Sequence, residues 1–180
     1  MPEFFTLVSP NEARVRILEQ VKSLGEAETI PTHQGVDRTL VVEATSPQVL
    51  PEFRRSSMDG YAVRAQDAFG ASESLPAYLK LAGEVPMGCA AEVDVSPGAA
   101  VLVHTGGMIP AGADAVVMVE NTQLVGQDEI EVRKPVAPGE NVIQVGEDIA
   151  PGDPILPSGH ILRPQDIGGL LAVGIDQIKV

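Results

Sequence analysis

Three short segments of the chain carry side chains that suit ligand binding or acid–base chemistry. The first, residues 56–63 (Ser-Ser-Met-Asp-Gly-Tyr-Ala-Val), places two hydroxyls, the Asp59 carboxylate and Gly60 directly after Arg54 and Arg55. Asp-Gly favours a tight turn because glycine adopts positive φ without steric cost. A carboxylate fixed on such a turn can face a ligand, but the same pair is typical of an ordinary β-hairpin with a solvated aspartate. The residues alone leave both interpretations open.

The second segment, residues 103–110, contains Thr105 followed by Gly106 and Gly107. Successive glycines free backbone N–H groups to form an anion-binding concavity, and Thr105 adds a hydroxyl donor. Thr-Gly-Gly is also an ordinary exit from a strand into a turn. The segment lacks the Gly-Lys-Ser/Thr element of a phosphate-binding P-loop, so it does not belong to that class of nucleotide site.

The third segment, residues 139–149, contains Gly146, Glu147 and Asp148 in succession. It is either a plain acidic turn or a loop that presents Asp148 to the same site as Asp59. Two carboxylates and a hydroxyl suit direct or water-mediated binding of Mg²⁺, positioning of a hydrolytic water, or hydrogen bonding to a polar ligand. No pairing of His with Ser supports nucleophilic catalysis.

The composition narrows the classes of partner. The 180 residues carry a formal net charge of −13, and residues 56–131 hold two basic and eleven acidic side chains, a formal charge of −9. Nucleic acids and anionic membrane surfaces require a basic footprint, so neither is an expected partner. The single cysteine, Cys89, excludes an intramolecular disulfide. The sequence shows neither a signal peptide nor an apolar run long enough to span a bilayer, and we expect a cytoplasmic protein.

The pattern along the chain predicts an α+β, mainly β fold. Ser9, Pro10 and Glu12 form a helix start, and apolar residues at 13, 17, 21 and 24 continue the helix towards Gly25. A second helix is expected over 165–173. Between the two helices, short runs typical of a small barrel or sandwich lie at 39–44, 78–81, 99–104, 115–120, 129–133, 141–145 and 155–156. We therefore expect one domain from residues 1–52 and 142–180, with a β-rich domain inserted over 53–141.

In order and spacing the three segments together resemble motifs of the MoeA family, the molybdopterin molybdenumtransferases. The similarity is to the N-terminal region of these proteins, which is related to the E domain of gephyrin. It runs from the helix at Ser9 to the turn at Gly174 and so covers nearly the whole chain. Each motif alone is common, whereas three in this order are specific.

The resemblance implies that the full-length protein is a homodimer that inserts molybdate into adenylylated molybdopterin with Mg²⁺ and releases AMP. It implies an elongated domain built from both chain ends and an inserted barrel-like domain, with this region forming one wall of the active-site cleft. By motif position the catalytic residues are Asp59, Thr105 and Asp148; Ser57, Gly106 and Gly107 are assigned to substrate binding, and Asp59 and Asp148 are the candidates for a metal.

Two features depart from the family pattern. His104 stands where the family has an apolar residue before Thr-Gly, and capping of a strand is the simpler role for it. The pterin-binding and C-terminal domains are expected after Val180, so the isolated fragment should be inactive. The alternative function is a non-catalytic dimerisation or scaffold module.

Overall fold

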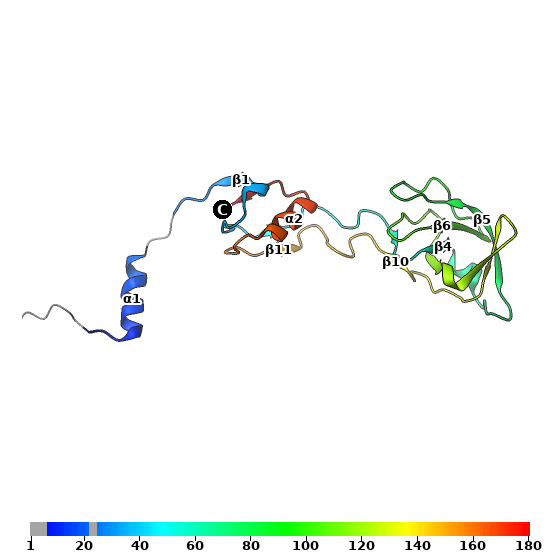
Figure 1. The fold of residues 1–180 in the computed structure, drawn as a ribbon, viewed down its shortest axis with the longest axis horizontal. Helices are drawn as coiled ribbons and strands as arrows, with labels where there is room; N and C mark the ends of the chain where they lie inside the picture. Colours follow the sequence, from blue (N-terminus) through cyan, green and yellow to red (C-terminus); the bar gives the residue numbers. More distant parts are fainter. Residues whose placement is uncertain (1–6, 22–24) are drawn as a thin grey trace, which may run out of the picture. The chain divides into compact units, whose positions relative to one another are not determined.

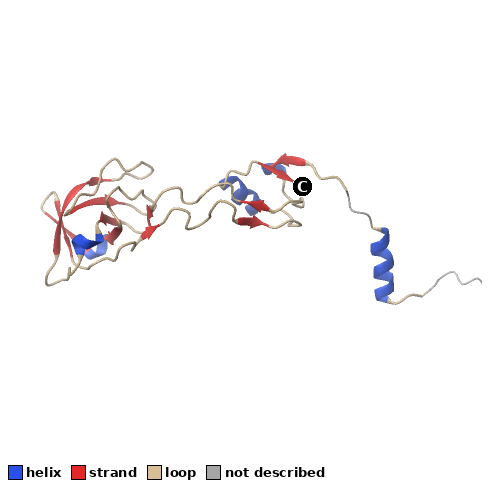
Figure 2. Cartoon of the chain, turned by 180° about the vertical axis from the view of Figure 1, so that it is seen from behind, coloured by secondary structure: helices blue, strands red, loops and turns tan. Residues whose placement is uncertain are grey.

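The computed structural model describes residues 7–21 and 25–180. Contacts divide the chain into two compact units. The end unit consists of Met1–Ala44 with Leu156–Val180, and the middle unit is Thr45–Ile155. Figures 1 and 2 trace the elements of each unit. In the described part of the chain no helix has the length and apolar character needed to cross a membrane.

The unit boundaries lie nearer the chain ends than residues 52/53 and 141/142, where the sequence placed them. Backbone hydrogen bonds account for the difference. Leu50 N–H donates to the Ile149 carbonyl at 2.8 Å, and Ile149 N–H donates back to Leu50 at 3.0 Å. Ser46 N–H donates to the Asp153 carbonyl at 2.9 Å. The segments on either side of the predicted insertion therefore pair with each other and group with the middle unit.

The middle unit is built on one curled six-stranded sheet (Figure 1). All neighbouring strands are antiparallel except β5 and β6, which run parallel. A separate two-stranded sheet pairs β3 with β10. In sheet order the six strands are β7 (Ala115–Met118), β4 (Gly60–Val63), β6 (Ala99–Val103), β5 (Ala77–Glu84), β9 (Glu129–Val132) and β8 (Thr122–Val125); the small sheet contains β3 (Arg55–Ser56) and β10 (Val142–Ile143).

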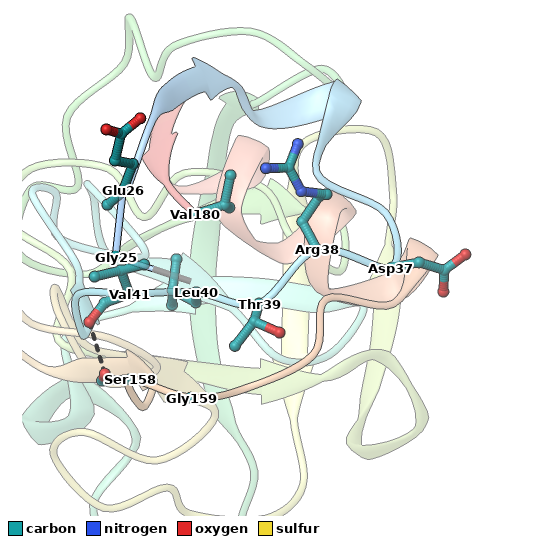
Figure 3. Close-up of a pocket in the computed structure, with 11 residues that line it drawn as sticks. Gly25, Glu26, Asp37, Arg38, Thr39, Leu40, Val41, Ser158, Gly159 and Val180 are labelled. Carbon is teal, nitrogen blue, oxygen red and sulfur yellow. Dashed lines mark hydrogen bonds between the residues drawn. The ribbon is translucent and has the colours of Figure 1, made fainter. Parts of the chain in front are cut away.

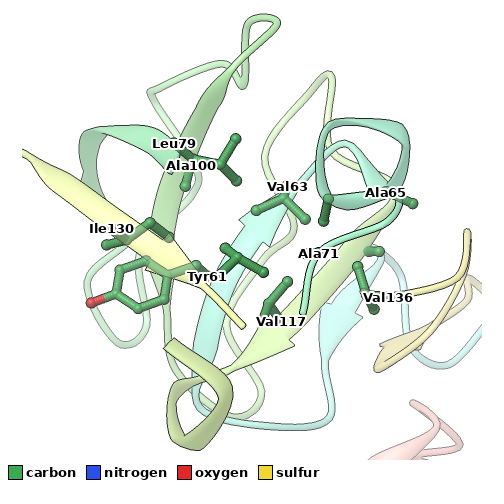
Figure 4. Close-up of a cluster of buried hydrophobic side chains, with 12 residues drawn as sticks. Tyr61, Val63, Ala65, Ala71, Leu79, Ala100, Val117, Ile130 and Val136 are labelled. Atoms are coloured by element: carbon green, nitrogen blue, oxygen red, sulfur yellow. The ribbon is translucent and has the colours of Figure 1, made fainter. Parts of the chain in front are cut away.

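Strand β4 lies between two apolar clusters. Tyr61 and Val63 belong to one cluster, shown in Figure 4, while Ala62 belongs to the other. Successive side chains of a strand point to opposite faces, so β4 is buried on both sides. The hairpin interpretation of residues 56–63 is therefore wrong: β4 pairs with β6 and β7, whereas β3 pairs with β10. Because both faces are apolar, β4 lacks the alternation that marks a half-buried strand.

The end unit contains both helices, and the helix start at Ser9 is confirmed. Glu12 N–H donates to the Ser9 hydroxyl at 3.2 Å, and Pro10 occupies the first helical position. The helix ends before Gly25, because Val21 already has an extended backbone; the predicted apolar position at Leu24 lies outside the described residues. The elements assigned wholly to this unit are α1 (Pro10–Gln20), β1 (Thr29–Pro31), η1 (Thr32–Gln34), α2 (Pro164–Ala172) and β12 (Gln177–Lys179), with β12 antiparallel to β1.

The shorter elements depart in part from the predicted strands. The run at 39–44 is mostly not a strand: only β2 (Ala44–Thr45) follows it, and Thr39 makes an isolated bridge with Ile161. The predicted strand at 155–156 is β11 (Pro154–Leu156). Strand β8 was not predicted. Two 3₁₀ helices also interrupt the middle unit, η2 (Ala65–Ala68) and η3 (Val119–Asn121).

The second predicted helix is confirmed as α2, and its start is held by Asp166. This buried carboxylate accepts the Arg163 backbone N–H at 2.9 Å, two bonds from the Arg163 guanidinium at 2.9 Å each, and lies 2.8 Å from His160 Nε2. These bonds, led by those from the guanidinium, hold the pKa of Asp166 well below its usual range. Gly174, with φ +79°, follows the helix end.

A substitution at Gly60 provides a test of how tightly β4 is packed. A Cβ added here would lie 2.1 Å from the Val117 carbonyl oxygen, a backbone atom that no side-chain rotation can move. We expect Gly60→Ala to destabilise the middle unit by about 3 kcal/mol or more, the upper end of overpacking costs. Urea unfolding followed by tyrosine fluorescence measures this, because the chain has no tryptophan and both tyrosines lie in the middle unit.

The control is Gly168→Ala in α2, where an added Cβ would meet no atom within 4 Å. This variant should leave the tyrosine-monitored midpoint unchanged. A wild-type midpoint for Gly60→Ala would contradict the packing of β4.

Candidate functional site

The first two motifs are joined through the backbone of Ser56. Its N–H donates to the Gly107 carbonyl at 2.9 Å, and its own carbonyl accepts from Gly106 N–H at 2.8 Å. The side chain of Ser56 is fully buried and bonds locally: the hydroxyl donates to the Met58 carbonyl at 2.5 Å and accepts from Met58 N–H at 3.3 Å. Ser56 thus shapes the turn that leads to Asp59 and fixes that turn against the Thr-Gly-Gly loop.

Asp59 and Thr105 are in direct contact. Asp59 Oδ1 accepts the Thr105 backbone N–H at 2.8 Å and the Thr105 hydroxyl at 3.1 Å. The backbone bond is the largest cause of a lowered pKa for Asp59, and the hydroxyl bond is the next. Within residues 7–21 and 25–180, Asp59 Oδ2 has no hydrogen-bond donor, and the side chain is 65% exposed. The contact therefore orients a charged carboxylate and leaves one oxygen free to accept from a ligand.

His104 lies between two carboxylates and is more than a residue at a strand end. Its Nε2 is 2.8 Å from Glu84 Oε1, and its Nδ1 is 4.0 Å from Asp59 Oδ1. Because the carboxylates face opposite ring nitrogens, the three side chains do not surround a common point. In agreement, the described part of the chain contains no group of three or more His, Cys, Asp or Glu side chains arranged to hold a metal ion.

The third motif is attached to the first by both backbone and side chain. Strand β10 pairs with β3, and Ser57 N–H donates to the Asn141 carbonyl at 3.1 Å. Asp148 Oδ2 accepts from the Arg55 guanidinium at 2.8 Å. Among the residues that the structure describes, no hydrogen bond or ion pair links Asp148 with Asp59. The structure therefore brings the three motifs together through residues 55–57, but holds the two aspartates by different partners.

The glycine amides expected to bind substrate are already engaged. Gly106 N–H donates to Ser56, and Gly107 N–H donates to the His104 carbonyl at 2.8 Å. The Ser57 hydroxyl has no protein partner in the described ranges, so it is free to bond to a ligand. The role of these three residues in substrate binding stays a prediction, and in this conformation it requires the two amides to exchange their partners.

Two residues of this site were not assigned a role from the sequence. Arg55 was noted only as a neighbour of the first motif, and its bond to Asp148 spans 93 positions. Ser56 was grouped with Ser57, although the structure buries Ser56 completely. A serine two residues before a turn is a signal for the local Ser56–Met58 bonds, but no short-range pattern indicates the partner of Arg55.

A depression of about 660 Å³ lies in the end unit, away from the three motifs in sequence (Figure 3). Among its lining residues, Ser158 donates its hydroxyl to the Val41 carbonyl at 2.6 Å. Arg38, its one cationic lining residue, is paired with Glu28. The depression contains no predicted site residue, and its lining brings no pair of catalytic groups together. The motifs of the middle unit are therefore the stronger candidate site.

The fold and the site define a mainly β protein in which two loops meet at the Asp59 carboxylate and a third is joined to them through residues 55–57. The model of the family described as the MoeA N-terminal region (domains I and II) matches residues 8–174. The chain belongs to this family.

Three relatives support the assignment. Molybdopterin molybdenumtransferase 2 of Mycobacterium tuberculosis is 34% identical over 152 residues, covering 84% of the chain, and molybdopterin molybdenumtransferase of Staphylococcus aureus is 33% identical over 169 residues, covering 94%. The crystal structure of the molybdopterin biosynthesis MoeA protein from Pyrococcus horikoshii superposes with a TM-score of 0.91 at 40% identity over 97% of the chain. The chain spans 37%, 40% and 46% of these proteins, less than half of each.

The lowered pKa of Asp59 provides a test of its contact with Thr105. We expect Thr105→Val to raise the pKa of Asp59 only part of the way towards its ordinary value of 3.8, because the backbone N–H remains. A depressed carboxyl pKa favours the folded protein above the ordinary pKa, and this contribution is lost as the pH falls through the folded value. Carbon-detected NMR titration of the Asp59 carboxyl in this chain measures the shift.

Thr105→Ser is the matched control, since it keeps both donors and should retain the wild-type pKa of Asp59. An unchanged pKa in Thr105→Val would show that the hydroxyl bond is absent in solution.

Proposed function

We propose that the full-length protein is a molybdopterin molybdenumtransferase, which inserts molybdate into adenylylated molybdopterin and releases AMP. Family membership and the names of the relatives support this proposal. The structural observation that best supports it is the Asp59–Thr105 contact, in which two of the three family motifs meet at one oriented carboxylate. The chain would supply one wall of the active site.

Within this proposal the side chains of the motifs have distinct roles. Asp59 Oδ2 accepts a hydrogen bond from the substrate or from a positioned water, while Thr105 keeps the carboxylate ionised and oriented. Asp148 offers a second acceptor oxygen beside Arg55. Ser57 contributes a hydroxyl, and Gly106 and Gly107 contribute amides if the ligand displaces their internal acceptors. These groups bind and orient, and none of them is paired for nucleophilic attack.

Magnesium fits this set only as an ion shared with the substrate. Mg²⁺ is commonly held by one or two carboxylates together with substrate phosphates, rather than by an all-protein cage. Asp59 and Asp148 would be its protein ligands, directly or through water, and each has one oxygen without a donor in the described part of the chain. The ion would neutralise phosphate charge, which the acidic middle segment does not do.

Within this proposal, binding of the anionic parts of the substrates depends on the rest of the protein. A net charge of −13 disfavours binding of molybdate and a pterin phosphate by this chain alone. We therefore propose that a pterin-binding domain forms the opposite wall, that the protein acts as a cytoplasmic homodimer, and that the isolated chain is inactive.

The second candidate, a non-catalytic dimerisation or scaffold module, is favoured by one observation. Helix α1 has no buried residue, and its Val15, Ile17 and Leu18 are exposed. Exposed apolar side chains of this kind are typical of assembly surfaces. The two functions are separated by assaying the full-length protein: a scaffold module assembles but does not insert molybdate.

Asp59→Asn in the full-length protein tests the proposed function. The amide oxygen of the new side chain can still accept both Thr105 bonds, so the fold should persist while the charge is lost. We expect molybdate insertion to fall by about 100-fold or more, because removal of one preorganised electrostatic group typically has an effect of this size; AMP release from adenylylated molybdopterin measures it.

Glu92→Gln is the control, because Glu92 is a carboxylate of the middle unit outside the three motifs. It should retain wild-type AMP release. Normal turnover by a folded Asp59→Asn variant would rule out the role given to Asp59.

A further inference from the structure

Arg55 is bound to each of the other two motif regions. In the small sheet it lies opposite Ile143, and it forms an isolated β-bridge with Met108. Its guanidinium donates to Asp148 at 2.8 Å. One residue of the first motif region thus contacts the loop after Thr105 through its backbone, and the third motif through both its backbone and its side chain.

The neighbouring arginine behaves differently. The Arg54 guanidinium donates to the Ala113 carbonyl at 3.1 Å, so it serves the packing of the middle unit. Arg55 instead points its charge at a carboxylate that the family motif identifies. The two adjacent arginines therefore have separate tasks, and only Arg55 meets a predicted site residue.

The Arg55–Asp148 pair is better suited to orientation than to stability. Its side chains are 35% and 54% exposed, and ion pairs at such exposure stabilise the folded state little. The backbone of Arg55 is paired on both sides, so its side chain extends from a fixed point. A guanidinium held in this way restricts where the Asp148 carboxylate can lie.

We propose that Arg55 is a positioning residue that acts through Asp148. It fixes the Asp148 carboxylate beside the joined first and second motifs, so that Asp148 and Asp59 face the same ligand. This inference rests on the proposed molybdate-inserting function.

A double-mutant cycle in the full-length protein tests it. Arg55→Gln and Asp148→Asn should each lower kcat for AMP release roughly 10- to 100-fold, the range expected for a misplaced group, with KM for molybdate changed less than about twofold. Because Arg55 acts through Asp148, the double variant should be no slower than Asp148→Asn alone. Arg55→Lys, which keeps the charge, should recover most of the loss.

Arg133→Gln is the matched control: Arg133 forms an ion pair with Glu131 in the middle unit, outside the motifs, and its loss should leave kcat unchanged. Wild-type kcat in Arg55→Gln, or a double variant slowed by the product of the two single effects, overturns the inference. A wild-type protein without insertion activity refutes the proposed function instead, together with the catalytic part of this inference.

The contact itself has a readout that does not depend on activity. In the 180-residue chain, Arg55→Gln should shift the carboxyl carbon resonance of Asp148 and leave that of Asp59 unchanged. An Asp148 resonance identical in the wild-type and Arg55→Gln chains would show that the ion pair is absent and would overturn the proposed role.

Discussion

The exchange of two backbone hydrogen bonds between Ser56 and the Gly106–Gly107 pair fixes the rest of the site. Ser56 is fully buried, so its N–H and carbonyl cannot reach water. Breaking either of its backbone hydrogen bonds would leave an unpaired polar group inside the protein. The register between the end of β3 and the loop after β6 is therefore set, and Asp59, three residues on, meets Thr105. Residues 55–57 also pair with the third motif, so the same short segment is the common neighbour of all three.

The two aspartates of the site are stabilised by different means. Neutral donors from Thr105 hold Asp59, and the shorter of them comes from the backbone, which no side-chain motion can withdraw. Asp148 is held by the cationic side chain of Arg55. Asp59 consequently keeps its full negative charge at a fixed position, whereas the charge of Asp148 is partly balanced. Of the two carboxylates, only Asp148 accepts a hydrogen bond from an arginine in the described part of the chain.

Short-range patterns in the sequence predicted the helices and strands that are determined by neighbouring residues. The Ser9 start of α1, the span of α2 and the strand after Ala99 depend on caps, glycines and short apolar runs. Strand β4 could not be found in this way, because its pairing with β6 and β7 lies far along the chain and both its faces are apolar. The family motifs gave Asp59, Thr105 and Asp148 as candidate site residues, but they could not reveal that the Gly106 and Gly107 amides are occupied or that Arg55 faces Asp148. Those facts depend on tertiary pairing.

The direction of the polar groups indicates what this surface can recognise. The loop amides donate inwards to Ser56 and His104, while Asp59 and Asp148 each present an oxygen without a donor in the described part of the chain. A surface that offers acceptors matches the N–H and O–H edges of a polar ligand, or the hydration shell of a cation. It does not match bare anions, for which the donors would have to point outwards.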